Sequence, residues 1–132
     1  MGIEGLSEFG GMEALEATIR FSGRRQRLVA HNIANISTPD FLQTDLSIKD
    51  FQAELGRAID ERRERGGGPI DLSSVGQSEP KQRSNLLFPD HNNRDIERLM
   101  QDQAENLMVY RTAIDLLRSR AEMMRSTLAG RV

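Results

Sequence analysis

The chain has 132 residues, of which 37% are hydrophobic and 5% aromatic, with no tryptophan and one tyrosine. With so few large side chains, long helices that pack side by side along apolar stripes are favoured over a β-sandwich or an α/β sheet. The 18 basic and 20 acidic residues are mixed along the chain, which argues against a nucleic-acid surface. Without cysteine, neither a disulfide framework nor a thiolate zinc site can form.

The N-terminal twenty residues lack the features of a secretory signal, because acidic residues stand where basic ones are expected and no unbroken apolar stretch follows. No run of about 18 consecutive apolar residues occurs, which argues against a transmembrane helix and direct membrane insertion. Residues 1–11 are rich in glycine, so we expect them to be mobile unless something outside the chain holds them.

An apolar stripe that begins at Met12 predicts a long helix packed against another helix. Its positions alternate in steps of three and four, which is the heptad pattern of a helix–helix seam. The stripe consists of Met12, Leu15, Ile19, Ser22, Gln26, Val29, Ile33 and Ile36. The two polar positions weaken its middle. A second apolar row would let the helix contact more than one neighbour; it consists of Ala14, Ala17, Phe21 and Leu28.

The first helix should end near Ser37, because Pro39 disfavours the α conformation before it and cannot donate a backbone hydrogen bond. A turn over residues 38–40 follows. Ser47 can cap a short helix near 48–64, which should finish at the glycine run 66–68. We interpret residues 66–92 as a flexible linker, with a short strand or hook at 86–88.

A second long stripe predicts a C-terminal helix of about 36 residues, which at about 1.5 Å per residue spans about 54 Å. The stripe consists of Ile96, Leu99, Gln103, Leu107, Tyr110, Ile114, Leu117, Ala121, Met124 and Leu128. The predicted fold is all-α: two long terminal helices in an antiparallel, coiled-coil-like pair, with a short middle helix and an irregular linker. We divide the chain into an N-terminal core helix at 1–39, a middle segment at 40–92 and a C-terminal core helix at 93–132.

No arrangement of reactive groups is visible in the sequence. The two histidines, His31 and His91, stand in different segments without metal-ligand spacing. The glycine run lacks the Lys-Ser/Thr and the preceding strand of a phosphate loop. We therefore expect no enzymatic activity, no cofactor and no metal. The residues expected to form helix and subunit packing surfaces are Leu15, Ile19, Val29, Ile33, Ile36, Ile96, Leu99, Leu107, Tyr110, Ile114, Leu117, Met124 and Leu128.

Asn32 and Asn35 fall on nearly the same face of the first helix, shortly before its predicted end. Their amides can bond to backbone carbonyls, to the following turn or to a neighbouring subunit. The simpler alternative is that they only terminate the helix.

The segment Asn32-Ile33-Ala34-Asn35, followed by Thr38, Pro39 and Phe41, resembles the N-terminal signature of bacterial flagellar rod and hook proteins. The arginine-rich segment before this motif is Arg24-Arg25-Gln26, and the matching late segment consists of Asn92, Asn93, Asp95, Ile96, Glu97, Met100, Asn106 and Tyr110. With both segments, the chain looks most like the proximal rod subunits of the B class. The family usually has glycine where this chain has Asp40. A type I turn with Pro39 in its second position would tolerate aspartate there.

The resemblance implies a structural, axial protein of the flagellar basal body. Such a protein would be exported through the flagellar type III apparatus without a cleaved signal and would polymerise through its terminal helices into the rod that crosses the periplasm. Its implied partners are other copies of itself, other rod subunits, and the membrane-ring, adaptor and export-gate proteins. The alternatives are a soluble helical adaptor or export-chaperone-like module, which would form a saturable one-to-one complex, and an enzyme, which would show turnover.

Overall fold

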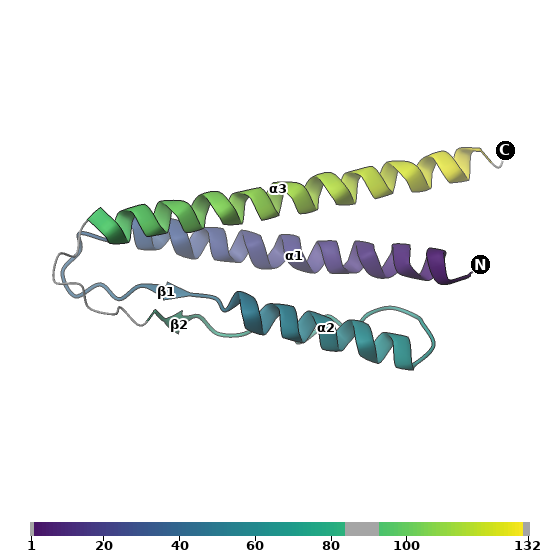
Figure 1. Ribbon diagram of the computed structural model, residues 1–132, viewed down its shortest axis with the longest axis horizontal. Helices are drawn as coiled ribbons and strands as arrows, with labels where there is room; N and C mark the ends of the chain where they lie inside the picture. The colour runs from purple at the N-terminus through teal and green to yellow at the C-terminus, as the bar shows by residue number, and fades with distance from the viewer. Residues whose placement is uncertain (1, 84–92, 131–132) are drawn as a thin grey trace.

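The computed structural model describes residues 2–83 and 93–130, with side chains for 11–83 and 95–130. Its elements are helix α1 (Gly2–Ala34), strand β1 (Thr44–Asp45), helix α2 (Ile48–Glu64), strand β2 (Lys81–Gln82) and helix α3 (Asn93–Ala129). α1 lies in the middle layer, with α3 on one side and α2 with the two strands on the other (Figure 1). Both termini lie at the same end, so α1 and α3 are antiparallel, which confirms the predicted all-α architecture.

Helix α1 begins at Gly2, about ten residues before the predicted start. The predicted start of the helix at Met12 is therefore wrong, because residues 2–11 are already helical. Each glycine inside a helix costs about 1 kcal/mol relative to alanine, but no proline lies between Gly2 and Ala34 to break the hydrogen-bonded ladder. The helix can therefore continue towards the N-terminus from the packed residues that follow.

The apolar core lies between α1 and the layer that contains α2. Phe21 of α1 and Phe51 of α2 stack with ring centroids 4.2 Å apart and planes within 6° of parallel. The buried cluster consists of Ala17, Phe21, Leu46, Phe51, Ala58, Ile70 and Val75. The second apolar row of the first helix therefore packs on the middle of the chain, while the other face of the helix packs on α3.

Helix α2 is capped as its sequence predicts, because the Ser47 hydroxyl accepts a hydrogen bond from the Asp50 backbone N–H at 3.1 Å. β1 and β2 form a short antiparallel pair in which Thr44 lies opposite Gln82 and Asp45 opposite Lys81. This pair joins the segment that follows α1 to the segment that precedes α3.

Residues 66–80 have irregular backbone, as predicted, but they are not a loose linker. Ile70 and Val75 are buried in the core, and side chains of the helices bind the backbone around them. Glu13 accepts a hydrogen bond from the Ile70 N–H at 2.7 Å, and Glu54 accepts one from the Gly76 N–H at 2.9 Å. Irregular backbone can be held this way without any periodic sequence pattern. The predicted strand at 86–88 lies outside the described residues.

The pairing of α1 with α3 is closest over the first half of α3. Leu99, Asn106 and Ala113 are buried and follow one another at intervals of seven residues. Among the described residues 114–130 none is buried, and in Figure 1 α1 and α3 diverge towards the two termini. The helix pair therefore closes at one end and opens at the other.

Candidate functional site

Asn32 holds the chain that leaves α1 against the helix. Its side chain is 0% exposed. Its Nδ2 donates to the Thr44 carbonyl at 2.8 Å, and its Oδ1 accepts from the Thr44 N–H at 3.2 Å. One amide thus satisfies both backbone groups of Thr44, as a neighbouring strand would. Asn32 therefore acts as a side-chain partner for β1.

Asn35 ends the helix. Its Nδ2 donates to the His31 carbonyl at 2.9 Å, and its Oδ1 accepts from the Thr38 hydroxyl at 3.3 Å. The His31 carbonyl also accepts a hydrogen bond from the Asn35 backbone N–H at 3.1 Å, so Asn35 binds it through both its backbone and its side chain. α1 ends at Ala34, three residues before the predicted Ser37, and residues 35–37 continue as turns. The two asparagines therefore have different tasks although they share a face.

The turn after α1 differs from the type I turn expected from the sequence. The Phe41 N–H donates to the Thr38 carbonyl at 3.2 Å, which places Pro39 second and Asp40 third in the turn. Asp40 has φ +60°, and a positive φ at the third position is the requirement of a type II turn. Phe41 then packs edge-on against His31, with ring centroids 5.4 Å apart. The prediction of a type I turn is therefore wrong.

A largely buried ion pair between α1 and β1 is a second contact that holds this strand. Arg25 Nε and Nη2 each lie 3.0 Å from a different carboxylate oxygen of Asp45, and the two side chains are only 8% and 15% exposed. Asp45 Oδ1 also accepts a hydrogen bond from the Leu46 N–H at 2.7 Å. Two parallel charge-assisted bonds set the orientation as well as the position of the strand.

Two further polar contacts connect this region to α3. Arg83, directly after β2, lies 2.7 Å from Asp102 in an ion pair that is mostly shielded from solvent. Asn106 Nδ2 donates to the Ser22 carbonyl at 2.8 Å and to Gln26 Oε1 at 2.7 Å. Of the two polar side chains that weaken the predicted seam, that of Gln26 is therefore matched by a polar residue of the facing helix, while Ser22 contributes its backbone carbonyl. A buried polar layer of this kind fixes the register of a helix pair.

Sequence reasoning missed Arg25, Asp45 and Asn106 as members of this site. The presence of Ser22 and Gln26 in the seam was the available signal for a polar partner on α3, but it did not identify Asn106. Nothing in the local pattern connects Arg25 with Asp45, because their contact depends on the path of the chain between them.

Comparison with known proteins identifies the family, although no protein-family model matches the chain. The chain is 29% identical to the flagellar basal body rod protein FlgB of Salmonella typhimurium, covering 90% of this chain and 98% of the relative. It is 27% identical to FlgB of Yersinia ruckeri, covering 90% and 93%. FlgB of Borrelia hermsii is 30% identical over 99 residues, covering 65% and 71%. The chain belongs to the FlgB family of flagellar basal-body rod proteins.

FlgB membership confirms the resemblance found in the sequence, and the structure gives the turn a physical reason. The resemblance places a glycine where this chain has Asp40, whose φ is +60°. Glycine enters that region without steric cost, and aspartate is one of the few other residues that tolerate it. In this chain, Asp40 adopts the positive φ that a glycine would adopt without steric cost.

In this FlgB-family chain, the expected packing residues differ in burial. Val29 and Leu99 are fully buried, and Leu128 is 66% exposed. The half-buried ones are Leu15, Ile19, Ile33, Ile36, Ile96, Leu107, Tyr110, Ile114, Leu117 and Met124. Of the motif, Ala34, Thr38 and Pro39 are exposed. Their solvent-facing positions leave them available for contacts outside the chain.

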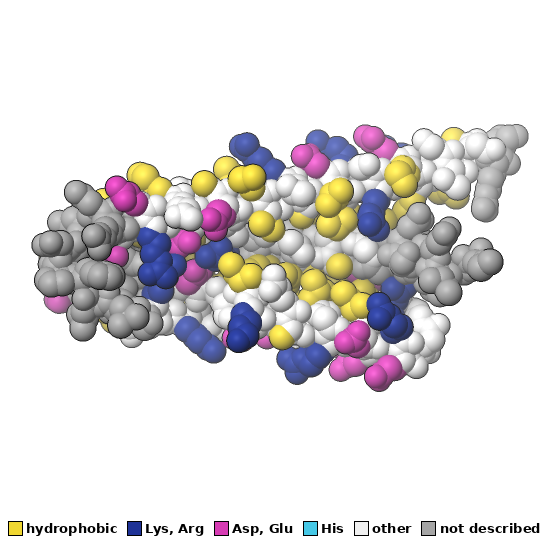
Figure 2. All heavy atoms as spheres, viewed as in Figure 1, with side chains coloured by type: hydrophobic (Ala, Val, Ile, Leu, Met, Phe, Trp, Pro, Cys, Tyr) yellow, Lys and Arg dark blue, Asp and Glu magenta, His cyan; other side chains and the backbone are white. Residues whose placement is uncertain are grey.

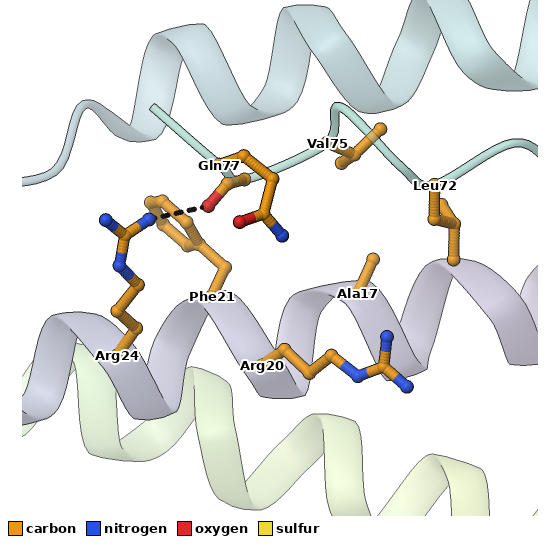
Figure 3. Close-up of a pocket in the computed structure, with 8 residues that line it drawn as sticks. Ala17, Arg20, Phe21, Arg24, Leu72, Val75 and Gln77 are labelled. Atoms are coloured by element: carbon orange, nitrogen blue, oxygen red, sulfur yellow. Dashed lines mark hydrogen bonds between the residues drawn. The ribbon is translucent and has the colours of Figure 1, made fainter. Parts of the chain in front are cut away.

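The described residues contain little that resembles a reactive site. A small hollow of about 90 Å³ lies between α1 and residues 72–77 (Figure 3). Arg24 at its edge donates to the Gly76 carbonyl at 2.9 Å, so this arginine serves the fold. Hydrogen bonds from Ser73 lower the pKa of the exposed Asp71 carboxyl, which is a local turn interaction. Within the described ranges no cluster of His, Asp and Glu is suited to a metal, and no helix is long and apolar enough to span a bilayer.

Proposed function

We propose that this rod protein polymerises through α1 and α3 into the axial drive shaft of the flagellar basal body. The observation that carries the proposal is the incomplete seam between these helices. Leu99 is 1% exposed at the closed end, whereas Leu128 is 66% exposed at the open end. Apolar seam positions without a partner in the same chain are typical of surfaces that neighbouring subunits cover.

The middle of the chain supports a different role for the other layer. β1, α2 and residues 66–83 have a core of their own against α1, and ion pairs and hydrogen bonds hold them there. This layer would form the lateral part of each subunit, while the open ends of α1 and α3 supply the axial contacts.

The partners in this proposal are other copies of the chain, other rod subunits, and the ring, adaptor and export-gate proteins of the basal body. The shaft would cross the periplasm and connect the membrane ring and export gate to the distal rod. Family membership supports this set of partners, and the seam that opens towards both termini supports helix-mediated contacts with them.

Leu128→Asp tests the proposal, because Leu128 is so exposed that a charge there leaves the folded chain intact. We expect normal helical circular dichroism of the purified variant, but loss of the protein from isolated basal bodies and loss of swimming. Ile114→Asp and Leu117→Asp, at half-buried seam positions, should also prevent assembly. Gln77→Asp adds the same charge at an exposed site in the middle layer and should assemble normally.

Normal incorporation of Leu128→Asp, Ile114→Asp and Leu117→Asp would show that these positions face no neighbour. The adaptor alternative makes a different prediction. If the chain bound one partner in a saturable one-to-one complex and was absent from purified rods, the structural role would be refuted.

A further inference from the structure

A second apolar surface on α3 lies beside the face that packs on α1. We call it the outer stripe; it consists of Val109, Leu116 and Met123, which are 50%, 48% and 56% exposed. Seven residues make almost two helical turns, so the three side chains lie in one row. The row is about 60° around the helix from the buried line of Asn106 and Ala113. It therefore continues the existing interface onto solvent-facing surface, and Figure 2 shows hydrophobic side chains exposed along α3.

The edge of the outer stripe is acidic. Asp115 and Glu122 directly precede Leu116 and Met123, and both carboxylates are exposed. If the stripe residues occupy the core positions of a heptad, Asp115 and Glu122 occupy the positions just before them. Charged residues at such flanking positions normally pair with charges on the neighbouring helix. Arg111 and Arg118 lie farther from the stripe on the same side. The outer stripe thus presents large apolar side chains with carboxylates at their border.

α1 carries a surface with smaller side chains and two arginines. Its outer face is exposed and consists of Glu16, Arg20, Arg27, Ala30 and Ala34; Arg20, at the border of this face, also lines the hollow beside residues 72–77. The two arginines are seven residues apart, the same interval as Asp115 and Glu122, which is about 10.5 Å along a helix. Small residues beside the arginines leave room for large side chains. Arg20 in Figure 3 extends along α1 with no hydrogen bond drawn to it.

None of these four charged side chains has an ion-pair partner within the described part of its own chain. The two surfaces belong to different helices and face different directions, so one molecule cannot join them. A second copy can, and the resulting contact is heterologous, because each copy uses its outer stripe on one neighbour and its outer α1 face on another. Such a contact does not close on itself and produces an extended assembly.

We propose that the outer stripe of α3 in one copy packs on the outer face of α1 in the next copy, with Asp115 and Glu122 paired to Arg27 and Arg20. The helices would run antiparallel, as α1 and α3 do within the chain. This inference rests on the proposed rod function and deepens it by assigning the surfaces of the contact between identical subunits.

Cysteine cross-linking tests the contact directly, because the natural chain has no cysteine. A chain with Arg27→Cys and Asp115→Cys should give a ladder of dimers and higher multimers in isolated basal bodies after mild oxidation. Each single variant should remain monomeric. Incorporation of the double variant without a ladder would overturn the contact while leaving the rod function standing. Cross-linked dimers from Asp115→Cys alone would overturn it in favour of a two-fold α3–α3 contact.

Charge reversal provides a second, independent test. Asp115→Arg with Glu122→Arg should lower incorporation about tenfold, since two attractive pairs become repulsive. Adding Arg20→Glu and Arg27→Glu in the same chain should restore most of the loss. Arg57→Glu, an exposed charge on α2, is the matched control and should have little effect. Failure of the compensating changes to restore incorporation would overturn the pairing.

The apolar part of the contact is tested by Leu116→Asp against Met100→Asp. Both residues are exposed on α3, but Met100 lies about 160° around the helix from Leu116. Loss of incorporation confined to Leu116→Asp supports the outer stripe, and equal loss in both variants overturns it. If the unaltered chain itself is absent from basal bodies, the proposed function fails and this inference fails with it.

Discussion

Replacing Asn32 with alanine should destabilise the folded chain by about 2–4 kcal/mol. Asn32 is fully buried, and its amide makes both hydrogen bonds to the backbone of Thr44. A typical hydrogen bond contributes about 1 kcal/mol net, but a buried donor or acceptor left without a partner costs about 1–3 kcal/mol. Alanine leaves both Thr44 groups unpaired, so the loss should exceed that of two ordinary hydrogen bonds.

The assay is urea unfolding of the purified chain followed by circular dichroism, with a shift in midpoint at constant slope. Asn35→Ala is the matched control, because it removes a nearby asparagine whose contacts are exposed. It should cost about 0.5–1 kcal/mol, the usual range for an exposed hydrogen bond. Asn32→Asp keeps the size of the side chain but places a carboxylate oxygen against the Thr44 carbonyl, so it should be at least as harmful as Asn32→Ala.

Equal losses for Asn32→Ala and Asn35→Ala would refute the distinction between the two asparagines. A neutral Asn32→Asp would show that the amide nitrogen does not donate to Thr44. Either result would return the pair to the simpler interpretation, in which both residues only end the helix.

Four other substitutions probe the fold by the same unfolding measurement. Asp40→Gly should stabilise the chain by about 0.5–1 kcal/mol, because it relieves a positive φ of +60° in an L-residue, and a destabilised variant would contradict the assigned turn. Asn106→Ala should cost about 1–3 kcal/mol by leaving the polar layer of Ser22 and Gln26 without its donor, and no change in midpoint would show that the layer adds nothing to stability. Gly56→Ala should stabilise the chain by about 0.5–1 kcal/mol, because Gly56 lies inside α2 with open space for a Cβ. Gly76→Ala should destabilise it by about 1–2 kcal/mol, because Gly76 has φ +72°. Stability changes of the same sign for both variants would be inconsistent with these conformations.

Much of the helical architecture was predictable because the packing face of a helix appears in the sequence as apolar residues spaced three and four apart. The three-four spacing of the stripes at Leu15–Ile36 and Ile96–Leu128 predicts both long helices, and Ser47 marks the start of α2. The start of α1 was not predictable in the same way, since glycine content lowers helix propensity without forbidding the helix. The motif with Asn32 and Asn35 identified the family before any contact was known.

In the candidate site, too, some features follow from the local sequence and others depend on contacts between distant segments. That Asn32 and Asn35 are special follows from their place before Pro39, but their separate tasks depend on where Thr44 returns. Arg25 and Asp45 are twenty residues apart, and Asn106 lies 84 residues from Ser22 and 80 from Gln26. No local pattern relates such residues, because their contacts depend on loop paths and helix register.

The sequence by itself therefore determined that the chain forms two long amphipathic helices, that the first ends at the Asn32–Pro39 segment, and that no reactive arrangement is apparent. Each of these properties depends on residue type and on spacing within a few turns. Only the tertiary structure decided that residues 66–83 are packed, that Asp40 takes a positive φ, and that the seam closes at Leu99 but opens at Leu128. Those properties arise from contacts between distant segments, which fix the backbone wherever buried polar groups must find partners.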